Sequence, residues 1–304
     1  MTETRIALLP DRGVVAVTGE DAGKLLQRVV TNEMANLDTA PALHAGLLSP
    51  QGKILLDFFV VKAADGFRLD TSRDKARELA QRLTLYRLRA KVEIADVSPH
   101  YTVAAIWGGS PPACDARNAL LFPDPRLAAL GHRCLVAMGG DWLIGAAGRA
   151  ATQQEYAAHR IALGVPEAGK DFALGDTYPH EALYDQLAGV SFKKGCYVGQ
   201  EVVSRMQHRG TTRKRVVIVV GTAPLPAPGT AVRAGEALIG TLGSTDGSRG
   251  LALLRLDRAV EMQAKGATLE AAGVALGIEI PSFATFTLPS PGAAVAGESP
   301  QDPT

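Results

Sequence analysis

Residues 189–201 read G-V-S-F-K-K-G-C-Y-V-G-Q-E, and most of what the sequence indicates about fold and function follows from this stretch. Its cysteine, Cys196, follows two lysines and a glycine. Apolar residues recur after it at four-residue spacing, at Val198, Val202 and Met206. Such spacing places side chains on one face of a helix. The stretch therefore predicts a helix with the cysteine at its start.

The surroundings of Cys196 predict a reactive thiol. The positive end of a helix dipole and the charges of Lys193 and Lys194 would each favour the thiolate. The alternative is a buried small side chain, which is what most free cysteines are. A reactive thiol could act as a nucleophile, carry a persulfide or bind a metal. Because iron–sulfur clusters usually take four thiolates, one cysteine could only share a cluster with a partner.

Length and composition predict a globular protein of one large or two to three smaller domains. The chain has 304 residues, of which 46% are hydrophobic and 21% charged, and its net charge is +1. This balance gives little support for bulk attraction to nucleic acid or to an anionic membrane. No apolar run approaches the roughly 20 residues of a membrane helix, so no membrane contact is expected.

Cysteine usage and the first residues predict a cytoplasmic protein. The three cysteines, Cys114, Cys134 and Cys196, are widely spaced and odd in number. This argues against a disulfide framework and fits a reducing compartment. The opening M-T-E-T-R-I-A-L-L-P-D-R-G lacks the apolar run of a signal peptide and the Arg/Ser-rich pattern of a transit peptide.

Apolar periodicity and turn residues predict an α+β chain. Residues 4–17 resemble a strand pair and 21–34 a helix, and 42–96 read as a strand-strand-helix-strand unit, half of a ferredoxin-like sandwich. Thr152 and Glu155 form a T-x-x-E capping box at a helix start. Short apolar pieces after residue 213, separated by Gly and Pro, predict a small β-barrel or sandwich. The predicted division is 1–45 with 102–212, then 46–101, 213–287 and a disordered tail, 288–304.

Two carboxylates and the neighbours of the thiol are candidate site residues. Asp57 interrupts the apolar strand I-L-L-D-F-F-V-V, where it faces either a pocket or solvent. Glu181 lies in a loop and could be merely solvated. Small or polar residues also lie next to the thiol: Gly195, Gly199, Gln200 and Glu201. The glycines permit close approach of a ligand, or ordinary turn and packing geometry.

A run of cations follows the predicted helix and could receive phosphates or RNA, although a solvated helix end is the more frequent explanation. Its members are Arg205, Arg209, Arg213, Lys214 and Arg215. The six histidines show no metal-ligand spacing, so no metal site is predicted within the chain itself. Neither a G-x-x-x-x-G-K-[ST] loop nor a G-x-S-x-G elbow occurs, which removes support for P-loop ATPases and serine hydrolases.

The motif K-K-G-C-Y-V-G-Q-E resembles the YgfZ-type folate-binding proteins, relatives of the glycine-cleavage T protein that are implicated in iron–sulfur cluster assembly or repair. The resemblance continues in L-L-Q-R-V-V-T-N-E-M, L-L-S-P-Q-G-K-I-L-L-D and R-I-A-L-G-V-P-E. These segments cover most of residues 5–215 in order, and the β-rich remainder suits the family's C-terminal barrel.

The resemblance implies a three-domain, T-protein-like ring with ferredoxin-like α/β units, whose central hole binds tetrahydrofolate or a one-carbon derivative. Asp57 matches the acidic position of the folate hairpin within one residue, and Glu181 resembles the carboxylate that binds the pterin. Gly195, Gly199 and the two residues after Gly199 would complete the cofactor site. The T protein has a D-K-G-D-F-like segment where this chain has K-K-G-C-Y, which argues against simple aminomethyl transfer.

The sequence thus predicts a cytoplasmic, tetrahydrofolate-binding accessory protein for iron–sulfur enzymes, with Cys196 as the reactive group. Its expected partners are iron–sulfur client or assembly proteins, and the resemblance extends the clients to tRNA-modifying enzymes. The alternatives are a tetrahydrofolate-dependent methyl- or aminomethyltransferase, in which Asp57 would be catalytic, and an RNA-binding module that uses the cation run. The sequence leaves open whether the protein catalyses any turnover.

Overall fold

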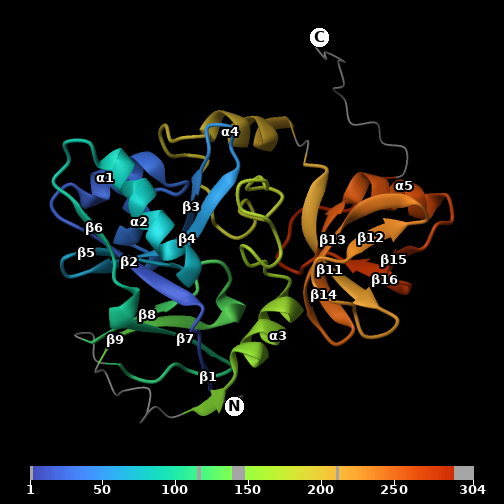
Figure 1. Cartoon of the computed structure of the whole chain (residues 1–304), viewed down its shortest axis with the longest axis horizontal. Coiled ribbons are helices and arrows are strands. Elements are labelled where there is room, and N and C mark those ends of the chain that lie inside the picture. The colour runs from blue at the N-terminus through green and yellow to red at the C-terminus, as the bar shows by residue number, and fades with distance from the viewer. Residues whose placement is uncertain (1–2, 115–117, 139–147, 210–211, 291–304) are drawn as a thin grey trace.

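The computed structural model describes residues 3–114, 118–138, 148–209 and 212–290. Two five-stranded sheets and a closed barrel surround a central region of irregular chain (Figure 1). The prediction of an α+β fold with a C-terminal barrel is confirmed. No helix in the described ranges is long and apolar enough to cross a membrane.

The first sheet is antiparallel and has the order β3-β4-β5-β2-β6. Its strands are β2 (Arg12–Thr18), β3 (Ala42–Leu48), β4 (Ile54–Ala63), β5 (Gly66–Ser72) and β6 (Glu93–Asp96). Helices α1 (Ala22–Val29) and α2 (Arg73–Arg87) pack with it, and the short η1 (Met34–Asp38) follows α1. Apolar side chains of alternate strand positions, such as Val15, Val17 and Phe58, meet those of the helices in one core.

The second sheet has the order β10-β1-β7-β9-β8 and precedes helix α3 (Gln153–Leu163). Its strands are β1 (Arg5–Leu8), β7 (Tyr101–Trp107), β8 (Ala119–Pro123), β9 (His132–Ala137) and β10 (Arg149–Ala151), with the short η2 (Ser98–His100) and η3 (Ala128–Leu130) in its connections. The predicted capping box is confirmed: Thr152 Oγ1 accepts from the Glu155 amide at 3.1 Å, and the Glu155 carboxylate accepts from the Thr152 amide at 2.8 Å.

The closed barrel lies on the other side of the molecule and has the strand order β11-β14-β13-β12-β15-β16 (Figure 1). Its strands are β11 (Lys214–Gly221), β12 (Ala231–Ala234), β13 (Ala237–Asp246), β14 (Arg249–Arg255), β15 (Leu269–Ala271) and β16 (Val274–Glu279). Helix α5 (Leu256–Ala264) joins β14 to β15. Closure leaves no free sheet edge. Helix α4 (Gln200–Arg209) precedes the barrel. Of the tail predicted to be disordered, 288–304, residues 291–304 lie outside the described residues.

The two sheets do not follow the predicted boundary between residues 45 and 46. β1 and β2, read from the sequence as a pair, belong to different sheets: β1 pairs with β7 and β10, whereas β2 lies between β5 and β6. β2 and β3, within the predicted 1–45 segment, therefore join the sheet of residues 46–101. These pairings are long-range in sequence, and local alternation does not specify them.

A buried ionic network joins α3, the loop after it and the barrel. Arg160 is 1% exposed, and its guanidinium donates to the Val165 carbonyl and Asp171 carboxylate, both at 2.6 Å, and to Ser244 Oγ at 2.9 Å. Asp171 also accepts from the backbone amides of Glu167 at 2.8 Å and Ser244 at 2.7 Å. One buried cation thus holds three separate segments in register.

The network continues toward the two sheets around the ring of Phe59. Three guanidinium groups lie over this ring, at 5.8 Å for Arg12, 4.9 Å for Arg126 and 5.3 Å for Arg133. Arg12 pairs with Asp70 at 2.7 Å, and Arg126 pairs with Asp124 at 2.7 Å. Arg133 lies 3.8 Å from Asp70 and 3.6 Å from Asp124, so three arginines share two carboxylates and one aromatic ring.

We predict that Arg160→Met destabilises the protein by about 3–5 kcal/mol, because it leaves Asp171 buried without its cation. Thermal unfolding of the full chain measures this. Arg149→Met is the matched control, since Arg149 pairs with Glu155 at the surface with 40% of its side chain exposed, and such pairs contribute about 0–1 kcal/mol. Equal effects of the two substitutions would contradict the role given to Arg160.

Candidate functional site

Lys194 anchors the cysteine loop to helix α1. It is 5% exposed, and its ammonium donates to the carbonyl oxygens of Gln27 at 2.7 Å, Val30 at 2.6 Å and Asn32 at 2.9 Å. Burial lowers the pKa of Lys194 to about 8, while the carboxylate of Glu33 acts in the opposite direction. Three carbonyls match the three donors of an ammonium group. The prediction that Lys194 stabilises a thiolate is therefore corrected, because its charge is engaged with α1.

Helix α4 begins at Gln200, four residues after Cys196, so the thiol is not at the helix start that was predicted. Gly199 has φ +81°, and a Cβ there would lie 2.5 Å from the Ser49 carbonyl oxygen and 3.0 Å from Gly52 Cα. The turn between β3 and β4 thus packs directly on the residue before α4. Glycine is therefore required at position 199 by its positive φ and by this close packing. This explanation needs no ligand beside Gly199.

Cys196 lies at the exposed tip of a loop whose flanks are buried. Lys194 and Tyr197 are 5% and 8% exposed, whereas Gly195 and Cys196 between them are exposed. A Cβ at Gly195 would meet no atom within 4 Å, so the space beside the thiol is open. Burial raises the pKa of the Tyr197 hydroxyl to about 12, in keeping with its role as an anchor. The loop presents a thiol to the outside on a fixed support.

The remaining side chains of the motif divide between surface and support. Lys193 is exposed beside the thiol, as is Phe192 with 43% of its surface. The Gln200 side chain accepts from the Tyr197 amide at 3.4 Å, and Glu201 pairs with Arg205 at 2.7 Å. Gln200 and Glu201 therefore bind neighbouring residues of the same loop and helix, whereas the sequence predicted that they contact a cofactor.

Within the ranges the structure describes, no three His, Cys, Asp or Glu side chains gather in a way that could hold a metal ion. Cys134 is buried on β9 and Cys114 is half-buried, and both belong to the core of the second sheet. Burial raises the pKa of the Cys134 thiol well above its usual range. Cys196 is thus the exposed cysteine of the three.

Asp57, on β4, faces inward and is bound by two residues that the sequence did not mark. Its carboxylate accepts from His44 Nε2 at 2.8 Å and from the Tyr184 hydroxyl at 2.5 Å. Although burial acts to raise it, the pKa of Asp57 is lowered to about 2 by the charge of His44 and by these hydrogen bonds. His44 lies on β3, opposite Phe59 of β4. Tyr184 comes from a distant loop, and no local sequence pattern connects Tyr184 with Asp57.

Asp57 and Glu181 are not brought to one cavity. Asp57 lines a space of about 30 Å³ at the arginine network, enclosed by residues such as Arg12, Arg126 and Arg133. Glu181 accepts from the Tyr178 amide at 2.8 Å, and burial raises the pKa of its carboxyl. A larger cavity of about 580 Å³ lies on the other side of the His44–Asp57 pair, beside Phe192 and Lys193.

The cation run after α4 is partly committed to the fold. Arg215 is 8% exposed and forms two hydrogen bonds with Asp185, at 3.0 and 2.9 Å. Arg205 pairs with Glu201, and the side chain of Arg209 lies outside what the structure describes. The run therefore does not form one open basic surface.

Fold and site together define a T-protein-like architecture that carries an exposed, anchored cysteine. The chain superposes on the glycine cleavage system aminomethyltransferase T from Bartonella henselae with a TM-score of 0.74 over 93% of this chain and 86% of that one, at 14% identity, which shows the fold alone. Residues 11–119 match the GCVT N-terminal domain, and residues 213–286 match the CAF17 C-terminal beta-barrel domain.

The chain belongs to the family of the IBA57/YgfZ-type iron–sulfur cluster assembly factors. It is 33% identical to the human iron-sulfur cluster assembly factor IBA57, mitochondrial, over 90% of this chain and 84% of the human protein. It is 35% identical to the homolog from Mycosarcoma maydis over 72% of this chain, and it spans 59% of that protein's length. The predicted family is thereby confirmed.

The predicted cytoplasmic location is contradicted by these relatives, because the human, mouse and M. maydis proteins are all named as mitochondrial. The prediction rested on three unpaired cysteines and on the first residues. Free thiols indicate reducing conditions, and these do not single out one compartment.

We predict that Lys194→Met loosens the cysteine loop, because three buried carbonyls lose their donor. A loss of about 3 kcal/mol corresponds to roughly 100-fold faster amide hydrogen exchange. Hydrogen exchange read by mass spectrometry over residues 190–197 measures it. Lys193→Met, one residue away and exposed, is the control and should leave exchange unchanged. Equal protection in the two variants would show that Lys194 is not the anchor.

Proposed function

We propose that this protein is an iron–sulfur cluster assembly factor that acts by offering Cys196 as one ligand to a cluster held by a partner protein. The observation that carries the proposal is the exposed thiol at the tip of a loop whose two flanks are buried. The names of its relatives, which describe iron–sulfur cluster assembly, support the same assignment.

The geometry suits a shared ligand better than a self-contained centre. A cluster needs four ligands, and the described residues offer no group of three that could hold a metal. The open space at Gly195 lets a second protein approach the sulfur closely. After Cys196 loses its proton to solvent, its sulfur displaces the exchangeable ligand from one iron of the partner's cluster and forms one iron–sulfur bond. The displaced ligand leaves to solvent, and the partner's own ligands hold the remaining positions. The clients served in this way would include the tRNA-modifying enzymes implied by the resemblance.

Tetrahydrofolate does not fit between Asp57 and Glu181 in this structure. The cavity at Asp57 has a volume of about 30 Å³, whereas sites for ligands of this size have roughly 300–1,000 Å³. Three arginines and Phe59 line this cavity beside Asp57. The Asp57 carboxylate already accepts hydrogen bonds from His44 and Tyr184. The Glu181 carboxylate accepts one from the backbone amide of Tyr178. The proposed function therefore includes no step that uses folate.

The same observations weigh against the two alternatives. A folate-dependent aminomethyltransferase needs its cofactor beside a catalytic Asp57, and the arginine network fills that space. An RNA-binding module would need the cation run at the surface, yet Arg215 is buried against Asp185.

We predict that Cys196→Ser abolishes formation of a cluster-bridged complex with an iron–sulfur carrier whose cluster has an exchangeable ligand. The hydroxyl is a far weaker ligand for iron than a thiolate. Size-exclusion chromatography with absorbance and circular dichroism of the cluster would detect the complex. Cys134→Ser is the control, since Cys134 is buried in the second sheet. A complex that forms equally well with Cys196→Ser would refute the proposal.

Folate binding gives a separate test. Calorimetric titration with tetrahydrofolate under anaerobic conditions is expected to show no saturable binding below about 1 mM, because the space at Asp57 is filled. Micromolar binding that is lost in both Asp57→Asn and Glu181→Gln would show that the central space opens and that folate belongs to the function.

A further inference from the structure

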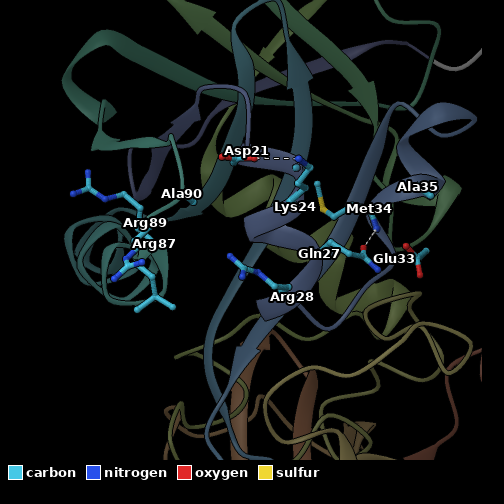
Figure 2. A pocket seen from close by; sticks show the side chains of 12 residues that line it. Asp21, Lys24, Gln27, Arg28, Glu33, Met34, Ala35, Arg87, Arg89 and Ala90 are labelled. Atoms are coloured by element: carbon cyan, nitrogen blue, oxygen red, sulfur yellow. Dashed lines mark hydrogen bonds and ion pairs between the residues drawn. The ribbon is translucent and has the colours of Figure 1, made fainter.

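A groove of about 1020 Å³ lies between α1 and the C-terminal end of α2, and neither Asp57 nor Glu181 lines it. Figure 2 shows Arg28 on α1 directing its guanidinium toward Arg87 at the end of α2. Met34, Leu88 and Ala90 contribute apolar surface to the lining. Its size and open form suit a segment of polypeptide more than a small molecule.

Exposed apolar side chains gather at the end of α2, where Leu88 lines the groove and Leu85 and Tyr86 precede the lining residues in sequence. Among the described residues, eight large hydrophobic side chains are exposed, and three of them lie in four consecutive positions: Leu85 at 77%, Tyr86 at 37% and Leu88 at 80%. Leu88 has φ +48° and ψ −114°, a backbone conformation that costs a non-glycine residue free energy. Scattered apolar residues are normal on a surface, whereas a cluster next to a groove marks a contact site.

The groove has an excess of positive charge. Its lining holds four cations and two anions: Lys24, Arg28, Arg87, Arg89, Asp21 and Glu33. Asp21 is already engaged by Lys24 at 3.2 Å and by the amide of Lys91 at 3.1 Å. Within the described part of the chain no ion pair involves the three arginines, and Arg87 donates only to the Val92 carbonyl at 3.4 Å. A segment that carries carboxylates would complement them, since arginine binds carboxylates through two parallel bonds.

The groove and the cysteine loop share a support. Gln27 and Glu33 line the groove, and the Gln27 carbonyl is one of the three that hold Lys194. The charge of Glu33 also acts on Lys194. In Figure 1 the loop before α4 runs toward α1. A protein docked in the groove would therefore lie close to the thiol of Cys196, two residues beyond the anchor.

We propose that this groove docks an acidic, amphipathic segment of the protein whose cluster Cys196 completes. The apolar face of the segment packs on Met34, Leu88 and Ala90, and its carboxylates pair with Arg28, Arg87 and Arg89. This inference rests on the proposed function for the identity of the partner, but the groove itself is independent of the thiol. Docking here would hold the partner while one iron–sulfur bond forms.

The experiment pans a displayed library of random 16-residue peptides on the full-length protein. We expect enrichment of peptides that combine Asp or Glu with Leu, Ile or Phe at helical spacing. Synthetic copies of these peptides should bind Arg87→Glu/Arg89→Glu at least 10-fold more weakly. Arg77→Glu, on the same helix but outside the groove, is the matched control and should change binding less than 2-fold.

Two further variants keep the result interpretable. Leu88→Gly keeps the backbone turn, because glycine adopts positive φ without strain, and it should fold while it binds the peptide several-fold more weakly. Cys196→Ser should bind the peptide unchanged, so failure of docking and failure of cluster sharing are told apart.

Neutral or basic enriched peptides would overturn the proposal, as would acidic ones that bind Arg87→Glu/Arg89→Glu normally. Displacement of the peptide by tRNA, or self-association of the protein that is lost in Leu88→Gly, would assign the groove to nucleic acid or to a second copy and would also overturn it.

Discussion

The pairing of Arg160 with Asp171 is the interaction on which the arrangement of the three parts depends. A guanidinium that is 1% exposed is tolerated only when its donors have partners. Here they donate to the Val165 carbonyl in the loop after α3, to the Asp171 carboxylate and to Ser244 of the barrel. The arginines around Phe59 are also buried and also need carboxylate partners, and they come from both sheets and their connections. Because a buried charge without its partner is costly, the sheets and the barrel cannot shift independently. The junction of the two sheets and the barrel is thereby a packed ionic network.

Asp57 lines the small cavity at this junction, and it accepts hydrogen bonds from Tyr184 and from His44, which lines the larger cavity. The loop of Cys196 lies farther out, and it is held by Lys194 beneath α1, by Tyr197, and by Gly199 against the β3–β4 turn. The central network supplies rigidity, and the loop uses it to hold a thiol at the surface.

Local signals predicted the elements well and their pairing less well. The capping box of Thr152 and Glu155, the helix after Ser72 and the barrel strands are all visible in the sequence, because caps and periodicity act over a few residues. The insertion of β2 between β5 and β6 was missed, since its partners are more than 45 residues away. At the candidate site, residue type and context singled out Cys196 and Asp57 in the sequence. His44 and Tyr184 were missed, because their importance arises from contact with Asp57 and not from any local pattern.

The sequence by itself determined the family, the α+β class with its barrel, and the position of the cysteine in the K-K-G-C-Y motif. Only the tertiary structure decided what the lysines beside that cysteine do. Lys193 and Lys194 are adjacent in sequence, yet one is exposed and the other is buried against the carbonyls of Gln27, Val30 and Asn32. These carbonyls lie at the end of α1 and just after it, more than 160 residues earlier. Whether a charge supports a thiolate or a loop depends on which oxygens lie within hydrogen-bond distance, and folding alone places them there.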